Sequence, residues 1–354
     1  MKKRKQKKVN GSCAVDLMAL VESVERFSSK TVVVYGDFVA DEFQYGDITR
    51  VSREAPVLIL RHRETRVLPG GAANAANNFA SLGAKVFPVT VVGDDAAGES
   101  LIRAFREKKV DVSGIVRTKG WSTPTKTRFL AGWAHKIGQQ VLRVDYEPAN
   151  ELPEVALTKL RVALKKTMAK ADALAISDYG FGVAAPEAAS EAFSRRRREV
   201  PVTLDSRYRL TSYKNAGVTS ATPNEGELET LHHTSIGKNV AELERCGEAT
   251  LGEMKLRSLL VTRGRDGMAV FQAGEKALHL PVHGSDIAVD VTGAGDTVLA
   301  AYTLGLASGA SPLEAAHIAN IAGGLVVMKR GTATVSRAEL LDAIRDMALE
   351  TIAE

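Results

Sequence analysis

Short apolar runs rich in β-branched residues alternate along this chain with stretches of helical periodicity. The apolar runs are Thr31–Tyr35, Ala173–Ser177, Val200–Asp205 and Ser258–Thr262, and the helical stretches lie near 153–169 and 186–198. Apolar strands separated by helices are typical of a parallel sheet covered by helices on both faces. We therefore expect an α/β fold, and each run ends at a polar residue, where an open α/β sheet binds its ligands.

Two further segments have a different pattern. Residues near 42–63 alternate polar and apolar positions, and residues 125–146 contain two strand-like runs. Such alternation indicates strands with one exposed face. These segments predict a small β-sheet lid beside one main domain that spans residues 31–354, with a basic disordered tail and an N-terminal helix in residues 1–30.

Composition limits the classes of protein that remain. The chain has 354 residues, of which 45% are hydrophobic and 25% charged, so it can bury a full core and form at most two domains. No apolar run approaches the roughly 18 residues that span a bilayer, and no signal peptide is visible, so we expect a cytoplasmic protein with no membrane partner. Cys13 and Cys246 lie far apart and support neither a disulfide nor a zinc site.

The net charge of +5 is concentrated partly in one place. The segment Met1–Lys8 carries six basic residues, and the rest of the chain is close to neutral. This distribution argues against a nucleic-acid groove. The run Arg195–Arg198 is interpreted as the solvated end of a helix.

The most informative chemistry lies in Asp290–Asp296, just before a helix-prone run. Gly293, Ala294 and Gly295 leave their backbone N–H groups free to face an anion at the positive end of the helix. Asp296 could then take a proton from a hydroxyl while the anion hole stabilises charge on a phosphoryl group. The segment predicts phosphoryl transfer to an alcohol; the alternative is a tight turn with Asp296 as a helix cap.

A second glycine segment, Pro69–Asn78, and the segment Thr222–Glu227 complete a pattern of three motifs. Together with Asp290–Asp296 they resemble the ribokinase-like (PfkB) carbohydrate kinases. The resemblance implies a ribokinase-like α/β fold and an ATP-dependent sugar kinase, in which a β lid closes over the sugar and pairs with the lid of a second subunit as a homodimer. Closure of a lid would exclude water from the reaction.

The resemblance also assigns the sugar site. The residues expected to bind substrate are Gly70, Gly71, Asn74, Asp37 and Asp41. The spacing of the two aspartates favours one face of a turn or short helix, and a carboxylate accepts two hydrogen bonds from a diol. For Asp37 a role in a turn or cap stays open.

On the nucleotide side, Asn224 and Glu227 are spaced to share one helical face and to organise a hydrated Mg²⁺, with a simple helix start as the alternative. The expected ATP contacts are Thr262, Gly264, Gly267 and Asn320. Asp290 and Thr292 are expected to bind a monovalent cation such as K⁺, unless Asp290 only hydrogen-bonds its loop. The chain has no Walker A motif, and residues 36–41 lack the Rossmann glycines, so neither a P-loop kinase nor an NAD-binding enzyme is expected.

A narrower resemblance concerns the sugar. The segments that carry it are Tyr35–Asp41, Phe43–Gly46, Ser52–Val57, Pro69–Asn74, Thr125–Arg128, Ser177–Gly180 and Gly331–Ser336. They are similar to D-glycero-D-manno-heptose 7-phosphate kinases, which implies phosphorylation of the C1 hydroxyl on the route to the ADP-heptose of lipopolysaccharide.

A phosphorylated sugar requires cationic partners, and Lys126, Arg128 and Arg207 are the candidates. Asp205–Arg207 departs from the Asp-Pro-Lys of that group, so the contact to the phosphate could differ. The sequence shows no appended nucleotidyltransferase domain, which is consistent with a stand-alone kinase. The alternatives are a kinase of another ketose, ketose phosphate or nucleoside, and a catalytically silent sugar-binding regulator.

Overall fold

The computed structural model describes residues 15–132, 139–193, 200–285 and 287–353. The predicted disordered tail, Cys13 and the run Arg195–Arg198 lie outside these ranges. Within them, no helix combines the length and the apolar composition needed to cross a membrane.

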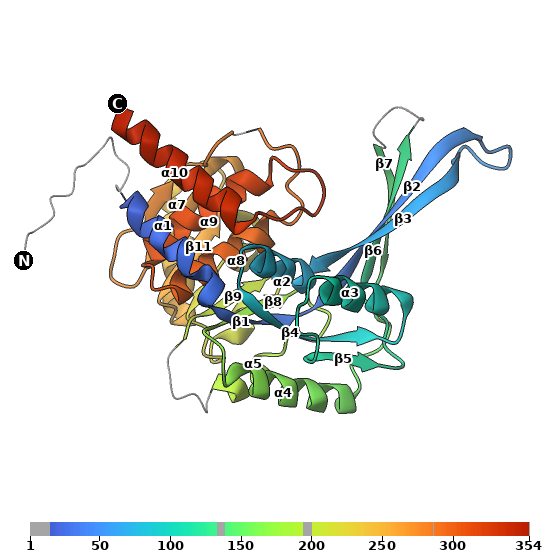
Figure 1. Ribbon diagram of the computed structural model, residues 1–354, viewed down its shortest axis with the longest axis horizontal. Coiled ribbons are helices and arrows are strands. Elements are labelled where there is room, and N and C mark those ends of the chain that lie inside the picture. The colour runs from blue at the N-terminus through green and yellow to red at the C-terminus, as the bar shows by residue number, and fades with distance from the viewer. Residues whose placement is uncertain (1–14, 133–138, 194–199, 286, 354) are drawn as a thin grey trace, which may run out of the picture.

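A nine-stranded sheet forms the centre of the molecule (Figure 1). In order across the sheet, its strands are β13 (Leu278–Leu280), β12 (Met268–Gln272), β11 (Ser258–Thr262), β10 (Ser220–Ala221), β9 (Val202–Ser206), β8 (Ala173–Asp178), β1 (Thr31–Gly36), β4 (Lys85–Gly93) and β5 (Ile115–Thr118). From β11 to β5 all neighbours are parallel, whereas β12 and β13 form an antiparallel edge. The predicted α/β fold with a mostly parallel sheet is confirmed.

Helices cover both faces of this sheet. The helices are α1 (Leu17–Glu25), α2 (Ala72–Ser81), α3 (Ala96–Glu107), α4 (Glu154–Met168), α5 (Pro186–Phe193), α6 (Glu225–His232), α7 (Val240–Met254), α8 (Ala294–Ala307), α9 (Pro312–Val326) and α10 (Arg337–Ala353), with short 3₁₀ turns at Arg26–Ser29, Leu210–Tyr213 and Gly264–Asp266.

Strand β1 explains how the two faces are separated. Its side chains alternate, so Val32 and Val34 join one buried cluster and Val33 and Tyr35 join the other. The first cluster contains α1, α2, α3, α8, α9 and α10, and the second contains α4 to α7. Because both faces are buried, the central strands are continuous apolar runs.

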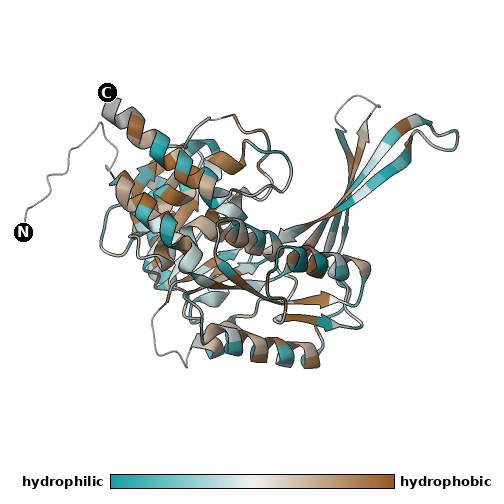
Figure 2. Cartoon of the chain, viewed as in Figure 1, coloured by the Kyte–Doolittle hydropathy of each residue, from teal (hydrophilic) through white to brown (hydrophobic). Residues whose placement is uncertain are grey.

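A second, four-stranded sheet, here called the small sheet, projects from this body (Figure 1). Its strands, in order, are β3 (Leu58–Gly71), β2 (Phe38–Val51), β6 (Thr125–Gly132) and β7 (Gln139–Tyr146). Figure 2 shows hydrophilic colouring along much of the β2–β3 hairpin. The hairpin is longer than the predicted segment 42–63, because its base is buried on both sides and has no polar alternation to reveal it.

The local structure around Asp37 and Asp41 corrects one prediction. Their spacing favoured a turn or short helix, but Asp41 lies inside β2, opposite Leu68 of β3 and Lys126 of β6. Pairing with two strands that are distant in the sequence therefore overrides the local spacing. Asp37 precedes the first residue of β2, so the two carboxylates lie in different surroundings.

Candidate active site

Two pockets meet where helix α8 begins. The polar pocket, a cavity of about 170 Å³, is lined by Asp41, Gly71, Asn74, Lys126, Arg128, Tyr179, Thr292, Gly293, Gly295, Asp296, Val39 and Thr332. The apolar pocket, of about 180 Å³, includes Ala294 and Gly295 in its lining. Gly295 borders both, so the first turn of α8 separates two cavities at the position where the sequence predicted an anion hole.

Asp296 is the buried carboxylate of the polar pocket, with 4% of its surface exposed. The Nδ2 of Asn74 donates a hydrogen bond to its Oδ2 at 2.7 Å, and the Tyr179 hydroxyl donates to its Oδ1 at 3.3 Å. Burial raises the pKa of Asp296 to about 7, against the opposing effect of these two hydrogen bonds. A carboxylate with a pKa near neutrality suits general base catalysis.

The start of α8 supplies backbone donors. Gly293 caps the helix in a left-handed conformation, with φ +78°. The N–H of Ala294 donates to the Val291 carbonyl at 3.2 Å, so it is not free to bind an anion as predicted. Among the described residues, the N–H groups of Gly295 and Asp296 have no acceptor. The helix dipole adds positive character at these two donors.

Asp41 faces the same pocket and carries a cationic partner. It is 6% exposed, and Arg128 Nη1 lies 2.6 Å from its Oδ1. Gly70 makes room for this carboxylate, because a Cβ at Gly70 would lie 2.4 Å from Asp41 Oδ2. Lys126 lines the pocket too, and burial lowers its pKa while the charge of Asp41 opposes that shift. The pocket therefore combines hydrogen-bond acceptors for hydroxyls with two cations for an anionic group.

Three predicted substrate ligands lie outside this lining, namely Gly70, Asp37 and Arg207. Asp37 is fully buried, and its carboxylate accepts hydrogen bonds from the backbone N–H groups of Tyr179, Phe181 and Val183 at 2.8, 3.2 and 2.9 Å. The prediction that it binds sugar is therefore corrected in favour of the turn role. Arg207 is exposed, and its guanidinium lies 5.2 Å from the ring centre of Tyr208.

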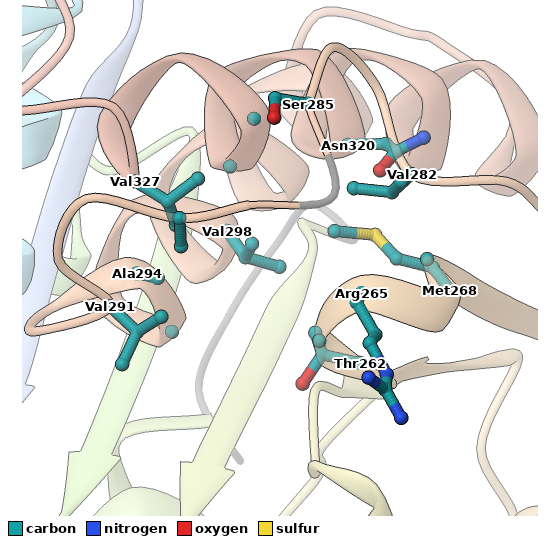
Figure 3. A pocket seen from close by; sticks show the side chains of 16 residues that line it. Thr262, Arg265, Met268, Val282, Ser285, Val291, Ala294, Val298, Asn320 and Val327 are labelled. Carbon is teal, nitrogen blue, oxygen red and sulfur yellow. The ribbon is translucent and has the colours of Figure 1, made fainter.

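The apolar pocket contains the four residues predicted to contact ATP, of which Figure 3 labels Thr262 and Asn320. These are Thr262, Gly264, Gly267 and Asn320. Figure 3 shows Met268, Val282 and Val298 pointing into the same space. A flat apolar ring fits such a cavity, and glycines at its edge allow close approach of the backbone. Asn320 itself is held by a 2.7 Å hydrogen bond from its Nδ2 to the Pro281 carbonyl.

Asn224 and Glu227 form the helix start that was the alternative to a metal role. The Asn224 side chain accepts from the Glu227 N–H at 2.9 Å, and Glu227 Oε2 accepts from the Asn224 N–H at 3.0 Å. Burial raises the pKa of Glu227. Burial and the negative charges of Glu227 and Asp296 raise the pKa of Asp205 well above its usual value. These carboxyl groups therefore repel one another when charged, and a bound cation would reduce that repulsion.

Cation binding has a limited basis in the described residues. They contain no group of three or more His, Cys, Asp or Glu side chains arranged for a metal. Asp290 accepts from the N–H groups of Thr292 and Gly331, each at 2.9 Å, as expected if it organises the loop. The Thr332 hydroxyl is buried and has no partner in the described part of the chain.

Tyr179 and Asp205 received no site role from the sequence. Tyr179 immediately follows β8, and Asp205 lies at the end of β9. The signal that could have indicated them is their position at the carboxyl ends of central parallel strands, where α/β proteins bind ligands. Tyr179 also belongs to the segment Ser177–Gly180, which carried part of the narrower resemblance.

Comparison with known proteins places this arrangement in a family. A model described as pfkB family carbohydrate kinase matches residues 29–339. The chain belongs to this family. The predicted family is thereby confirmed, and with it the expectation, at the level of the family, of an ATP-dependent carbohydrate kinase.

Two curated relatives are each named bifunctional protein HldE. The protein of Mesorhizobium japonicum is 38% identical over 327 residues, which cover 92% of this chain and 64% of that protein. The protein of Geobacter sulfurreducens is 36% identical over 314 residues, which cover 88% of this chain and 62% of that protein. This chain therefore spans less than two thirds of the length of these relatives.

Solved structures share the fold. Arabidopsis thaliana ribokinase complexed with ribose and ATP superposes with a TM-score of 0.70 at 22% identity, covering 89% of this chain and 99% of that chain. Phosphofructokinase-2 from Escherichia coli in complex with potassium superposes with a TM-score of 0.72 at 19% identity, covering 90% of this chain and 99% of that chain. The likeness confirms the ribokinase-like architecture of the central sheet with its smaller sheet.

Proposed function

We propose that this protein is an ATP-dependent sugar kinase that phosphorylates the C1 hydroxyl of D-glycero-D-manno-heptose 7-phosphate. The observation that carries the proposal is the position of Asp296, a buried base in the polar pocket, beside Gly295, which borders both pockets. Lys126 and Arg128 in the polar pocket favour a sugar that already bears a phosphate. The choice of heptose rests on the sequence segments similar to heptose 7-phosphate kinases, and the role in lipopolysaccharide synthesis rests on the same similarity.

The residues of the polar pocket have different roles in the proposed reaction. Asp41 and Asn74 orient the sugar through its hydroxyl groups, and Asp296 takes the proton of the reacting hydroxyl. The oxygen of that hydroxyl forms the new bond to phosphorus, and the bond from this phosphorus to the ADP oxygen breaks. The N–H groups of Gly295 and Asp296 stabilise negative charge on the transferred group. ATP, when bound, supplies the γ-phosphoryl group and leaves as ADP.

The carboxyl groups near the start of α6 fit a hydrated Mg²⁺. The pKa values of Glu227 and Asp205 are both raised, and the charge of Glu227 contributes to the shift of Asp205, so a divalent cation near them would relieve their repulsion. Asn224 positions Glu227 through the capping box. Mg²⁺ would neutralise charge on the phosphates.

For a monovalent cation such as K⁺, we infer a site at the loop that contains Asp290 and Thr292. The buried Thr332 hydroxyl, which has no partner among the described residues, supports a ligand at this loop. The Asp290 carboxylate holds the loop through its hydrogen bonds to Thr292 and Gly331.

The small sheet is proposed to act as a lid and as the contact of a homodimer. Val141, Leu142 and Tyr146 of β7 are 44%, 55% and 58% exposed. Exposed apolar side chains on a sheet edge favour association with a second copy. Cytoplasmic location and the absence of nucleic-acid partners stay predictions from the sequence.

The test is ATP-dependent phosphorylation of heptose 7-phosphate, fructose 6-phosphate, fructose 1-phosphate, ribose and nucleosides. We expect preference for heptose 7-phosphate, activity that falls below about pH 7, and a loss of kcat of about 10²- to 10⁴-fold in Asp296→Asn. The exposed Asp346→Asn on α10 is the control and should be unchanged.

The other outcomes separate the alternatives. Preference for another sugar would discard the heptose assignment and keep the kinase mechanism. Sugar binding without turnover of any compound would identify a catalytically silent regulator.

A further inference from the structure

Tyr179 is held in a defined place at the end of β8. Its backbone N–H donates to Asp37 Oδ2 at 2.8 Å, and the same carboxylate accepts from Phe181 and Val183. Asp37 is completely buried. One carboxylate thus fixes the donors of three alternate residues of the loop, so the Tyr179 side chain enters the polar pocket from an ordered backbone.

Two functional groups of the pocket meet at this side chain. The Tyr179 hydroxyl donates to Asp296 Oδ1 at 3.3 Å, while Asn74 occupies the opposite oxygen of the carboxylate. Lys126 Nζ lies 5.5 Å from the centre of the Tyr179 ring, within the range of a cation–π contact. The phenol therefore contacts the proposed base with its hydroxyl and a proposed phosphate ligand with its ring.

The simpler explanation is that Tyr179 only fills space. Against it, Asp296 is the only hydrogen-bond partner of the hydroxyl among the described residues. Burial and the charges of Asp296, Asp205 and Asp41 hold the pKa of Tyr179 well above its usual value. The phenol consequently stays protonated and always acts as a donor to the carboxylate.

We propose that Tyr179 is a positioning residue for the kinase reaction, which orients the Asp296 carboxylate through its hydroxyl and holds Lys126 beside the sugar through its ring. This inference rests on the proposed function and assigns to Tyr179 a part in it. A donor to one oxygen, with Asn74 at the other, fixes the plane of the carboxylate and leaves its remaining lone pairs for the reacting hydroxyl.

The expected consequence is a change in the pH dependence of the reaction. The groups that face Asp296 are Asn74 from α2, Tyr179 after β8, Asp41 from β2, Lys126 from β6 and Asp205 from β9. Removing the phenol donor destabilises the charged carboxylate, so the pKa of Asp296 rises. As the pH is lowered, activity is then lost at a higher pH than in the wild type. For one long charge-assisted hydrogen bond we expect a shift of about one pH unit.

The experiment compares the pH profile of kcat/KM in the wild type and in Tyr179→Phe, with the exposed Tyr208→Phe as control. In Tyr179→Phe the acid limb should move up by about one unit, with a roughly tenfold loss near pH 6 and near-normal rates at pH 9. An unchanged profile, or an equal loss at every pH, would overturn the proposal. Phenylalanine keeps the ring that contacts Lys126, so the KM for the sugar phosphate should be unchanged in Tyr179→Phe. Tyr179→Leu removes the ring and should raise this KM roughly three- to tenfold.

A second readout separates this inference from the proposed function. If the wild type phosphorylates no sugar tested, the proposed function fails, and the titration of Asp296 is followed directly by ¹³C NMR of γ-carboxyl-labelled aspartate. The signal is assigned by its absence in Asp296→Asn. A higher pKa in Tyr179→Phe than in the wild type would support the positioning role, and equal values would refute it.

Discussion

Gly293→Ala is the substitution for which the structure gives the most specific expectation. Gly293 has φ +78° and ψ 9°, a conformation that residues with a Cβ rarely adopt. The added methyl carbon would lie 2.4 Å from Asn74 Nδ2 and 3.5 Å from Thr332 Cγ2. Because the first distance is shorter than any real contact, the Asn74 amide has to move away from α8.

The magnitude follows from two separate effects. The left-handed conformation costs about 1–2 kcal/mol of folding free energy for alanine. Displacement of Asn74 breaks its 2.7 Å hydrogen bond to Asp296, and a bond to a charged group is worth about 1.5–3 kcal/mol. Since one pKa unit is about 1.36 kcal/mol, the pKa of Asp296 should rise by roughly one to two units from about 7. At pH 7 the deprotonated fraction then falls by roughly five- to fiftyfold.

Gly309→Ala is the matched control. Gly309 also has a positive φ, +90°, but a Cβ there meets nothing within 4 Å. Urea denaturation should give a loss of about 1–2 kcal/mol in the free energy of unfolding for both variants, with any further loss confined to Gly293→Ala. Only Gly293→Ala should lose kcat/KM at pH 7 and regain much of it at pH 9. Equal activities of the two variants at pH 7 would refute the reasoning.

Two other predictions concern the cation and the assembly. Glu227→Gln keeps an acceptor for the capping box but removes the charge, so the Mg²⁺ concentration for half-maximal activity should rise by about tenfold or more, while Glu314→Gln in the capping box of α9 should leave it unchanged. Equal Mg²⁺ curves for the two variants would exclude Glu227 from the metal site. Light scattering should give the mass of a dimer for the wild type and of a monomer for Leu142→Lys in the small sheet, and a monomeric wild type would contradict the lid contact.

The central sheet could be predicted because its strands are buried on both faces. β1, β8 and β11 are uninterrupted apolar runs, and this pattern distinguishes them from the amphipathic helices between them. β10 could not be found in this way, since its two residues, Ser220 and Ala221, are too few to show a period. It exists because β9 and β11 hold it on both sides.

Asp37 and Asp41 show where local spacing fails at the site. Both follow β1, and a separation of four residues indicated a shared helical face. The structure instead continues as β2, which pairs with β3 and β6 and turns Asp41 into the polar pocket. Asp37 remains at the junction, where buried backbone donors need an acceptor. The choice between ligand and loop anchor depends on pairing partners up to 85 residues away in the sequence, as for Asp41 and Lys126.

The pKa of the proposed base, Asp296, depends on tertiary structure even more than the location of this residue does. Asp296 could be predicted from its own segment, because small residues before a helix indicate an anion site. Its pKa of about 7 could not, because burial sets it, and the donors that moderate it, Asn74 and Tyr179, lie 222 and 117 residues away in the sequence. A motif can therefore indicate the residue that we propose takes the proton, whereas the pH at which it would do so depends on packing. For this reason substitutions at Gly293 and Tyr179, which leave Asp296 itself unchanged, are the ones that should move the pH profile.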